Sequence, residues 1–332
     1  MKVKEFRHKK NIYRIFLLIT LLFCTGVSGC GSGKDSDSKP EKSSETVKST
    51  EDSGDGNGEK RDNTPRVLKI STDRSEIYEG ADTVIDASSA SEGYVTVSYN
   101  GTAGKVRTLI KCPNGETYNF LTNTGGEDNV YPLTEGSGTY NVGVYENIEA
   151  DQYAMLISED ISVNISDEKR VFLYPNKYVD FDDSTKAVKK AEELAGGAKD
   201  DLDVVELVYH YVTENISYDY DKAETVPADY VPDVDDTLDS GKGICFDYSS
   251  LMATMLRTQG IPTRLEVGYS GDVYHAWISV YIEEIGWIDD IIEFDGKDWV
   301  LMDPTLASYA EDSTIEEYME NSDKYYTIKY KY

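Results

Sequence analysis

The sequence predicts an all-β sandwich followed by an α+β domain in which a helix packs on an antiparallel sheet. Three observations support this fold class. Residues 66–166 are short alternating runs separated by Asn-Gly, Gly-Gly and Gly-Ser turns, the pattern of a sandwich. Residues 167–332 open with two segments of helical periodicity. Strand-like alternation returns later in the same region, so helices and strands are mixed in the second domain.

The runs that predict strands in the first domain are 67–72, 83–88, 94–99, 107–112, 117–122, 139–146 and 153–166. Several tyrosines are expected to pack on their half-buried faces and not to hold a ligand: Tyr94, Tyr99, Tyr118, Tyr140, Tyr145 and Tyr153. Cys112 precedes Pro113 at a predicted strand end, which indicates an unpaired structural thiol. The domain either presents substrate to the second domain or is a spacer, and the sequence leaves both open.

Two helices are predicted at the start of the second domain, over residues 184–195 and 203–216. One broad face of the second helix is apolar and consists of Val204, Val205, Leu207, Val208, Tyr211 and Val212. His210 falls outside this face, so we expect a solvated histidine without a catalytic role. Residues 315–332 are expected to form a helix and a closing strand.

Cys245 stands at the start of a third predicted helix. It follows the glycine-rich turn at 240–243, and apolar residues then recur at helical spacing: Leu251, Met252, Met255 and Leu256. Gly260 and Pro262 predict that the helix ends about fifteen residues after it begins. Unpaired N–H groups and the helix dipole favour a thiolate in the first turn, so Cys245 is a candidate nucleophile.

Two later strands carry residues that suit such a thiol. Alternation in the strand predicted over 273–282 puts His275 on the same face as Trp277, Ser279 and Tyr281. Asp303 ends a further strand, which Pro304 terminates. A thiol at a helix start, an imidazole on a strand and a carboxylate on another strand form a Cys–His–Asp arrangement for nucleophilic catalysis.

Five motifs in this order resemble the transglutaminase-like superfamily. They are GIC before a helix, LRTQGIPTR at its end, VGY in the next strand, HAW in the one after, and W…DPT last. The resemblance covers about residues 204–308 and implies a papain-like core, with the cysteine helix packed on an antiparallel sheet. It implies that Cys245, His275 and Asp303 are the catalytic residues. It also aligns the segment 216–220, which contains Tyr218, with the family's stretch before the cysteine helix.

The chain departs from the family pattern between HAW and DPT, where residues 282–298 are longer than a tight hairpin needs. Asp295-Gly296 is expected to form the turn before the last strand, which would leave Asp303 in place. Asp289 and Asp290 compete for the carboxylate role, but neither ends a strand as Asp303 does.

Each candidate also has a structural interpretation. Cys245 could be a buried structural thiol or the disulfide partner of Cys112. His275 could be a strand residue whose ring is hydrogen-bonded within the fold, and Asp303 could be an ordinary turn residue before proline. One reachable histidine and one thiol are too few ligands for zinc, so neither a metal nor a cofactor is expected. The candidate walls of a substrate pocket are Trp277, Trp287, Trp299 and Tyr218, and core packing is the alternative for each.

Residues 1–29 resemble a lipoprotein signal peptide. A basic region precedes the apolar run 15–23, which is too short to span a bilayer. Val27-Ser28-Gly29-Cys30 resembles a lipobox, which implies cleavage before Cys30 and lipid attachment to its sulfur. An uncleaved anchor or a plain secretory signal is the alternative.

Residues 30–65 contain almost no apolar side chains, so we expect a disordered tether. The predicted location is the outer face of the cell membrane, through a lipid anchor.

Charge limits the partners. Without the first 29 residues the chain has 27 basic and 61 acidic residues, a net charge of −34. Such a surface disfavours nucleic acid and bare anionic lipid, which need basic patches. The acid-rich stretch 227–241 matches no EF-hand spacing, so a solvated loop is favoured over a calcium site.

The predicted activity is thiol-dependent acyl chemistry on protein or peptide amides through a thioester. Water gives hydrolysis and an amine gives an isopeptide cross-link, and the same three residues serve both outcomes. The resemblance favours hydrolysis, because bacterial members more often imply peptidase-like or amidase action. The alternatives are a cross-linking transglutaminase and a non-catalytic surface binding module with a vestigial triad.

Overall fold

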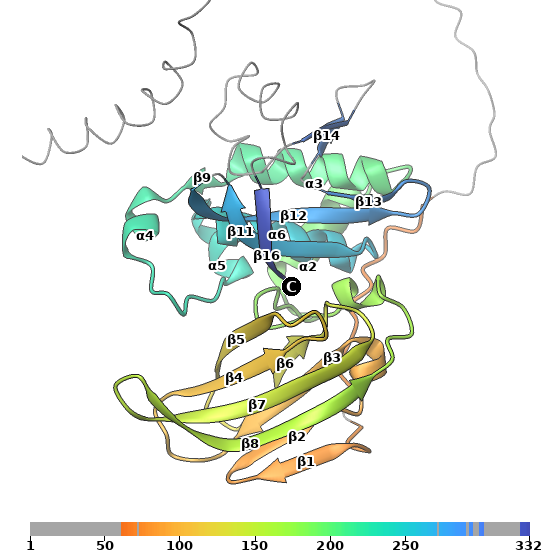
Figure 1. The fold of residues 1–332 in the computed structure, drawn as a ribbon. Coiled ribbons are helices and arrows are strands. Elements are labelled where there is room, and N and C mark those ends of the chain that lie inside the picture. Colours follow the sequence, from red (N-terminus) through yellow and green to blue (C-terminus); the bar gives the residue numbers. More distant parts are fainter. Residues whose placement is uncertain (1–60, 72, 271, 290–291, 295–298, 302–325) are drawn as a thin grey trace, which may run out of the picture. The chain divides into compact units, whose positions relative to one another are not determined.

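The computed structural model describes residues 61–71, 73–270, 272–289, 292–294, 299–301 and 326–332. The first part of this region folds into two four-stranded antiparallel sheets, of order β1-β2-β3-β6 and β5-β4-β7-β8 (Figure 1). Their strands are β1 (Ile77–Gly80), β2 (Thr83–Asp86), β3 (Tyr94–Tyr99), β4 (Val106–Lys111), β5 (Thr117–Thr122), β6 (Asn129–Pro132), β7 (Gly138–Glu149) and β8 (Gln152–Val163). A short 3-10 helix, η1 (Ala90–Glu92), precedes β3.

The two sheets face each other across an apolar core. The rings of Phe120 on β5 and Tyr131 on β6 come from different sheets, and their centroids are 4.5 Å apart. Valines on alternating positions of β3 and β7 are fully buried, as expected for inward-facing residues. The predicted β-sandwich is therefore confirmed.

Two strands differ from the expectation, and one predicted strand is absent. Residues 67–71 form no strand, whereas β1 and β6 were not predicted. Strand β1 is mostly exposed at a sheet edge, and β6 is only four residues long and ends in Pro132, so neither has a clear alternating pattern. Four of the six tyrosines are at most 3% exposed (Tyr94, Tyr99, Tyr118 and Tyr140), while Tyr145 and Tyr153 are only half-buried.

The second part of the chain combines helices with a sheet of order β13-β12-β11-β16. After the 3-10 helix η2 (Arg170–Leu173), its helices are α2 (Lys186–Ala195), α3 (Asp201–Asn215), α4 (Tyr220–Thr225), α5 (Val234–Ser240) and α6 (Cys245–Thr258). The sheet strands are β11 (Thr263–Ser270), β12 (Val273–Ile282), β13 (Gly286–Ile288) and β16 (Tyr326–Lys331). Two-stranded pairs are formed by β9 (Ser217–Tyr218) with β10 (Lys242–Gly243), and by β14 (Ile292–Phe294) with β15 (Trp299–Leu301).

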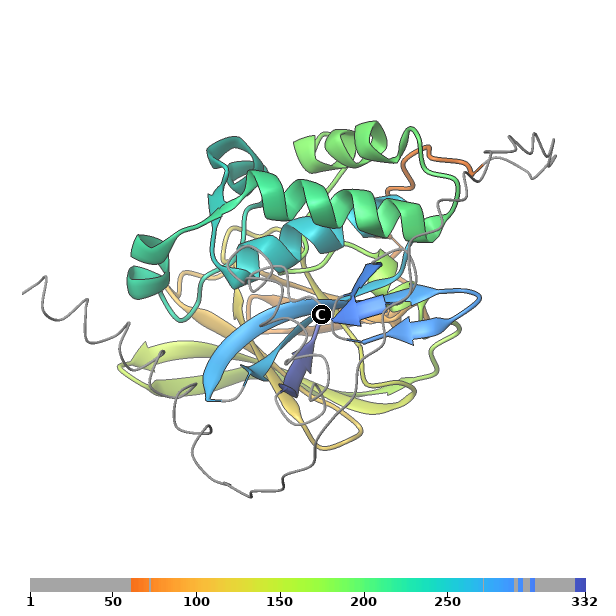
Figure 2. The same ribbon diagram turned by 90° about the horizontal axis from the view of Figure 1, so that it is seen from above.

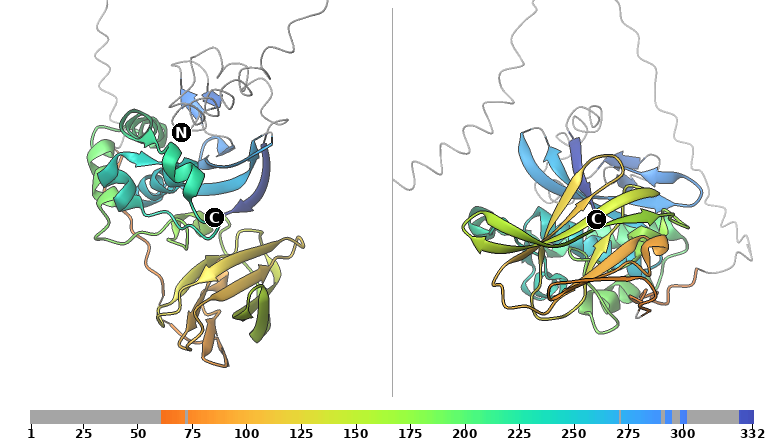
Figure 3. Two further views of the ribbon diagram at one scale, coloured as in Figure 1. Left: turned by 90° about the vertical axis from the view of Figure 1, so that its left-hand side faces the viewer. Right: turned by 60° about the horizontal axis from the view of Figure 1, so that its bottom comes forward.

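Helix α6 packs on the sheet through β11 and β12, and helices α2 and α3 pack on α6. Figure 2 shows this layering, with the helices in green and cyan on one side of the blue strands. Both panels of Figure 3 show β16, in dark blue, beside the lighter blue strands, in agreement with its antiparallel pairing to β11. The expected arrangement of a cysteine helix on an antiparallel sheet is thus present, and so is the closing strand; the helix predicted before that strand lies outside the described residues.

Almost every residue of α6 is buried, including Arg257 in its last turn. The guanidinium of Arg257 donates hydrogen bonds to the carbonyl oxygens of Thr263, Tyr174 and Tyr332 at 2.6–2.9 Å. These bonds offset the cost of burying the charge and tie the end of α6 to three separate segments.

Helix α3 is rotated relative to the predicted apolar face. Tyr209 is buried, whereas Leu207 is 38% exposed and Tyr211 is half-buried. The fully buried residues Val204, Val205, Val208, Tyr209 and Val212 form one stripe at helical spacing, and Leu207 lies at its margin. His210 is on the outer side, with ring nitrogens 3.8 Å from Glu206 and 4.0 Å from Glu214, as predicted.

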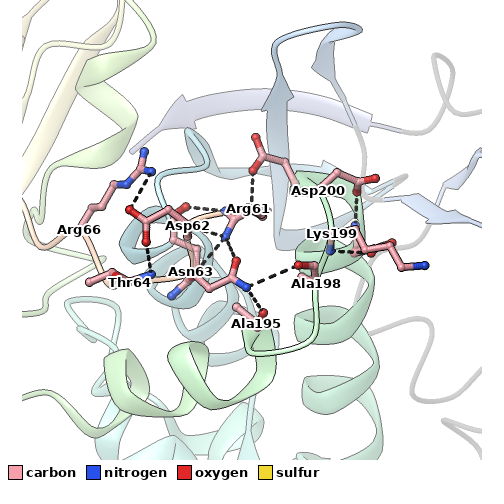
Figure 4. Close-up of polar contacts among 12 residues, drawn as sticks. Arg61, Asp62, Asn63, Thr64, Arg66, Ala195, Ala198, Lys199 and Asp200 are labelled. Carbon is pink, nitrogen blue, oxygen red and sulfur yellow. Dashed lines mark hydrogen bonds and ion pairs between the residues drawn. The ribbon is translucent and has the colours of Figure 1, made fainter. Parts of the chain in front are cut away.

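The sequence predicts a disordered tether up to residue 65, but residues 61–66 are bonded to the helical part of the fold (Figure 4). Arg61 donates to the Gln259 carbonyl oxygen at 2.7 Å and pairs with Asp201 at 2.9 Å. The Asn63 side chain donates to the Ala195 carbonyl oxygen at the end of α2, and the Arg66 N–H donates to the Thr258 carbonyl oxygen at the end of α6. These polar groups satisfy carbonyls at helix ends, so the segment is ordered without apolar side chains.

None of the helices in the described ranges is long and apolar enough to cross a membrane. The predicted signal peptide and Cys30 lie outside the described residues. The four predicted segments, 1–29, 30–65, 66–166 and 167–332, therefore remain predictions, except that residues 61–65 belong to the folded part of the chain.

Candidate active site

Helix α6 begins at Cys245, and local hydrogen bonds fix this start. The N–H of Ile244 donates to the Asp247 carboxylate at 2.8 Å, and the N–H groups of Asp247 and Tyr248 donate to the Ile244 carbonyl oxygen. As the first helical residue, Cys245 has an N–H that no carbonyl of the helix can accept. The helix dipole at this end favours an anionic sulfur. The thiol of Cys245 is half-buried and that of Cys112 is buried. Both are free, so the alternative of a disulfide between them is excluded.

The residues before Cys245 pair with the segment that carries Tyr218. Strand β10 runs parallel to β9, with Gly243 opposite Tyr218, and the Asp219 N–H donates to the Gly243 carbonyl oxygen at 2.9 Å. This pairing brings Tyr218 to the start of the cysteine helix, where the sequence places it as a pocket residue.

His275 lies on β12, which β11 separates from β16 at the sheet edge. It is opposite Gly268 of β11, and the pairing of β11 with β16 shifts register between Val267 and Gly268. A Cβ atom at residue 268 would lie 2.0 Å from the Thr327 carbonyl oxygen of β16. Only glycine allows this close approach of the two backbones, so Gly268 sets the position of the strands beside the imidazole.

Cys245 and His275 line the same cleft, whose volume is about 370 Å³. Aliphatic and aromatic side chains form its walls, and the aromatic ones are Tyr178, Tyr218, Tyr230, Phe246, Tyr274 and Tyr332. Among the described residues that line it there is no Asp, Glu, Lys or Arg. Burial is the main cause that raises the pKa of Tyr274 to about 12, with smaller contributions from neighbouring tyrosines and from Cys245. The cleft therefore offers a thiol and an imidazole within neutral, largely apolar walls.

Residues 188–304 match the family model of the Transglutaminase-like superfamily. This range contains the helix start at Cys245 and the strand of His275. The chain carries a transglutaminase-like domain.

A curated relative is the uncharacterised protein YebA of Bacillus subtilis (strain 168), 26% identical over 187 residues. The match covers 49% of this chain but only 25% of YebA, so the chain spans about a quarter of that relative's length.

Several solved structures resemble the chain, among them the following three. A candidate cysteine protease from Cytophaga hutchinsonii has 16% identity and a TM-score of 0.33, over 64% of this chain and 67% of that one. A candidate protease from Parabacteroides distasonis has 10% identity and a TM-score of 0.28, over 60% and 61%. Red sea bream transglutaminase has 14% identity and a TM-score of 0.26, over 66% and 48%.

Two of the predicted pocket walls in the transglutaminase-like domain need correction. Trp277 is 1% exposed and donates its indole N–H to the buried Glu266 at 2.9 Å; Ser279 donates to the same oxygen at 2.8 Å. Trp287 stacks on the Arg264 guanidinium, 3.5 Å from the ring centroid. Neither lines the cleft. Alternation correctly placed Trp277 on the same strand face as His275. The indole is buried in the core, however, whereas His275 is only half-buried. The side chain of Trp299 lies outside the described residues.

Asp303, the predicted third catalytic residue, also lies outside the described residues, as do the competing Asp290 and the predicted Asp295-Gly296 turn. On either side of residues 295–298, β14 and β15 pair in antiparallel orientation. Asp289 does not line the cleft; its carboxylate is 60% exposed and 3.6 Å from Arg264.

The acid-rich stretch 227–241 is partly helical and not a plain loop. Asp233 caps α5 by accepting from the N–H groups of Asp235 and Asp236 at 3.0 Å. Asp235 in turn accepts from the first N–H groups of α2. The acids thus stabilise helix starts, where negative charge is favourable. Within the part of the chain that the structure describes, no group of three His, Cys, Asp or Glu residues could hold a metal ion.

Sequence reasoning missed three residues at the start of the cysteine helix. The buried Asp247 carboxylate accepts hydrogen bonds from Tyr230 at 2.5 Å and from the Ile244 N–H, and its other polar neighbour is the Lys222 ammonium at 2.7 Å. Asp247 is three residues after the N-cap residue Ile244, a spacing from which its capping role could have been predicted. Lys222 and Tyr230 meet it only in the folded chain, so no local pattern marks them.

Proposed function

We propose that the transglutaminase-like domain is a cysteine enzyme that transfers acyl groups of protein or peptide amides through a thioester, with hydrolysis as the main outcome. The observation that carries this proposal is that Cys245, at a helix start, and His275, on the adjoining sheet, line one cleft. Asp303, from the DPT motif, completes the proposed triad.

The proposed reaction begins when the Cys245 thiolate attacks the amide carbonyl carbon while His275 holds the thiol proton. A carbon–sulfur bond forms, and the Cys245 N–H at the helix start donates to the developing oxyanion. The carbon–nitrogen bond then breaks, and the imidazolium gives its proton to the departing amine. Water, deprotonated by His275, attacks the thioester and releases the acid and the free thiol. Asp303 would keep the imidazole in the orientation and tautomer that these steps need.

Two features of the cleft support hydrolysis and an apolar substrate segment. Trp277 and Trp287, which were candidates to shield the thioester from water, do not line the cleft. Tyr274, which does, is 57% exposed. An open cleft admits water, which competes with an amine for the thioester. Neutral aromatic walls favour an apolar or aromatic side chain beside the reactive amide.

The test uses full-length protein in detergent with peptide amide substrates, in the presence and absence of a primary amine. Wild type should release carboxylic acid and amine, and Cys245→Ala should lower the rate about 10³-fold or more. Cys112→Ala is the matched control and should retain activity. A predominance of amine adducts would make cross-linking the main reaction. Equal product from wild type and Cys245→Ala would refute the enzyme proposal and favour a non-catalytic binding module.

We further propose that the protein acts at the outer face of the cell membrane, anchored by lipid on Cys30 and acting on surface proteins or peptides. The motif Val27 to Cys30 and the basic and apolar residues before it support this location. Metabolic labelling with a fatty acid should mark wild type, and Cys30→Ser should abolish the label. Labelling of the variant equal to wild type would contradict lipid attachment at Cys30.

A further inference from the structure

A fully buried carboxylate lies two residues after the proposed nucleophile. Asp247 is 0% exposed, and its Oδ2 accepts the Ile244 N–H at 2.8 Å. This bond holds the turn that presents Cys245, so the carboxylate serves as a cap for α6. A buried negative charge is costly unless it is paired, and here it belongs to the same helix turn as the cysteine whose sulfur must become negative.

Lys222 on α4 supplies the compensating charge. Its Nζ lies 2.7 Å from Oδ2 of Asp247 and donates to the Tyr230 hydroxyl at 2.6 Å. The Tyr230 hydroxyl donates to Oδ1 of the same carboxylate at 2.5 Å. Burial first, and then the hydrogen bond to Asp247, raises the pKa of Tyr230, so its phenol keeps its proton and remains a donor. Both carboxylate oxygens are therefore satisfied, one of them by a cation.

The position of this ion pair gives Lys222 a role beyond stability. A carboxylate near a thiol disfavours the thiolate, and a cation near it favours the thiolate. The cap requires the carboxylate, since the Ile244 N–H needs its acceptor. The lysine ammonium pairs with a capping acid that lies in the same helix turn as the candidate nucleophile.

We propose that Lys222 is a positioning residue for the nucleophile: it neutralises Asp247, so that the carboxylate caps helix α6 without opposing the thiolate of Cys245. This rests on the proposed function in taking Cys245 as the nucleophile. Lys222 does not touch the substrate in this proposal; it acts through Asp247 on the ionisation of the sulfur.

The test measures the rate at which iodoacetamide alkylates Cys245 as a function of pH, with full-length protein and mass spectrometry of the Cys245 peptide. Lys222→Met should move the midpoint of this profile upward by about one pH unit and slow alkylation at pH 7 about 10-fold. Lys222→Arg should keep the wild-type midpoint, because it keeps the charge. Lys186→Met is the matched control: it removes a lysine that pairs with Asp239 on the surface, and its profile should equal that of wild type.

The route through Asp247 is tested by a double variant. In Lys222→Met/Asp247→Asn the midpoint should return toward the wild-type value, since the uncompensated carboxylate is gone. Asp247→Asn alone should leave the midpoint at or below that of wild type. A double variant that keeps the upward shift, or a single Asp247→Asn that raises the midpoint, would overturn the proposal. Lys222→Gln replaces Lys222→Met if the methionine variant does not fold, as judged by its thermal transition.

Failure of this inference is separable from failure of the proposed function. If wild-type Cys245 reacts no faster than the same thiol in denatured protein, both are refuted. If wild type cleaves peptides and Cys245 is reactive, but Lys222→Met has the wild-type midpoint, only the role of Lys222 is refuted.

Discussion

The two cysteines of the folded region occupy opposite kinds of environment. Cys112 follows β4 in the sandwich, is 5% exposed, and points its sulfur at the Ile110 carbonyl oxygen, 3.8 Å away. Burial, reinforced by the charges of Glu135 and Glu116, raises its pKa to about 12. Cys245 is half-buried at the positive end of a helix, in a cleft that also contains an imidazole.

The difference shows that backbone position and surrounding charge, and not residue type, decide what a thiol does. A strand end inside a β core has neither a helix dipole nor unpaired N–H groups to hold an anion. A helix start has both, and at α6 Lys222 pairs with the capping carboxylate of Asp247. The predictions below test this contrast, beginning with the largest effect.

The largest expected effect is on thiol reactivity. With native full-length protein at pH 7, iodoacetamide should label Cys245 at least about 10³-fold faster than Cys112, because a thiol of pKa about 12 is almost never ionised at that pH. Peptide mass spectrometry measures both rates. In denaturant the two rates should become similar, and rapid native labelling of Cys112 would break the contrast.

Removal of the imidazole should reduce that difference. His275→Gln should slow labelling of Cys245 about 10-fold at neutral pH, since a nearby imidazolium stabilises the thiolate. Labelling of Cys112 should not change in the same sample, which serves as the internal control. An unchanged rate at Cys245 would show that His275 does not act on the sulfur.

Protein stability should depend more on Cys112 than on Cys245, the reverse of their order in thiol reactivity. Cys112→Ala removes a buried sulfur from a packed core and should lower the free energy of unfolding by about 1–2 kcal/mol. Cys245→Ala should lower it by less than about 0.5 kcal/mol, because the side chain is half-buried at the cleft. Urea unfolding measures both values. A larger loss for Cys245→Ala would indicate a structural role for the candidate nucleophile.

The last prediction concerns alkaline stability. The Cys112 thiol keeps its proton up to about pH 12 in the folded state, whereas an unfolded thiol loses it near pH 8.5. Between these values the folded state binds more protons, so the contribution of Cys112 to stability is present below about pH 8.5 and is lost as pH rises toward 12. Over this window the free energy of unfolding should fall less steeply with pH in Cys112→Ala than in wild type. The difference in slope should correspond to about one bound proton at most. Parallel curves would show that Cys112 does not titrate differently in the two states.

Local patterns predicted the elements that position the site. Helical spacing after the glycine-rich turn located the start of α6 at Cys245, and period-two alternation located the strand of His275. These predictions succeeded because a cap, a breaker and an alternating face are encoded within a few neighbouring residues. The match of residues 188–304 to the superfamily agrees with the motif order read from the same stretch.

Such local patterns could not predict how deeply a side chain is buried or which residues distant in the sequence meet in the fold. Alternation gives the face on which Trp277 lies but not that it reaches Glu266 in the core. Nothing near Lys222 in the sequence indicates that it meets Asp247, since that contact forms only when α4 returns to the start of α6. Residues 61–65 were wrongly assigned to the disordered tether, because polar composition indicates a missing core but does not reveal bonds from Arg61 and Asn63 to helix-end carbonyls.

Gly268 bears on how this protein could be engineered or diversified. Any side chain there would have to displace the Thr327 backbone, so substitutions at this codon should be depleted in a selection for activity, whatever their polarity. Its neighbour Tyr269, 41% exposed, should tolerate many replacements. A mutational scan of β11 would therefore show an abrupt change of tolerance between two adjacent positions, and directed evolution of the cleft is better aimed at its aromatic walls than at the strand that supports the imidazole.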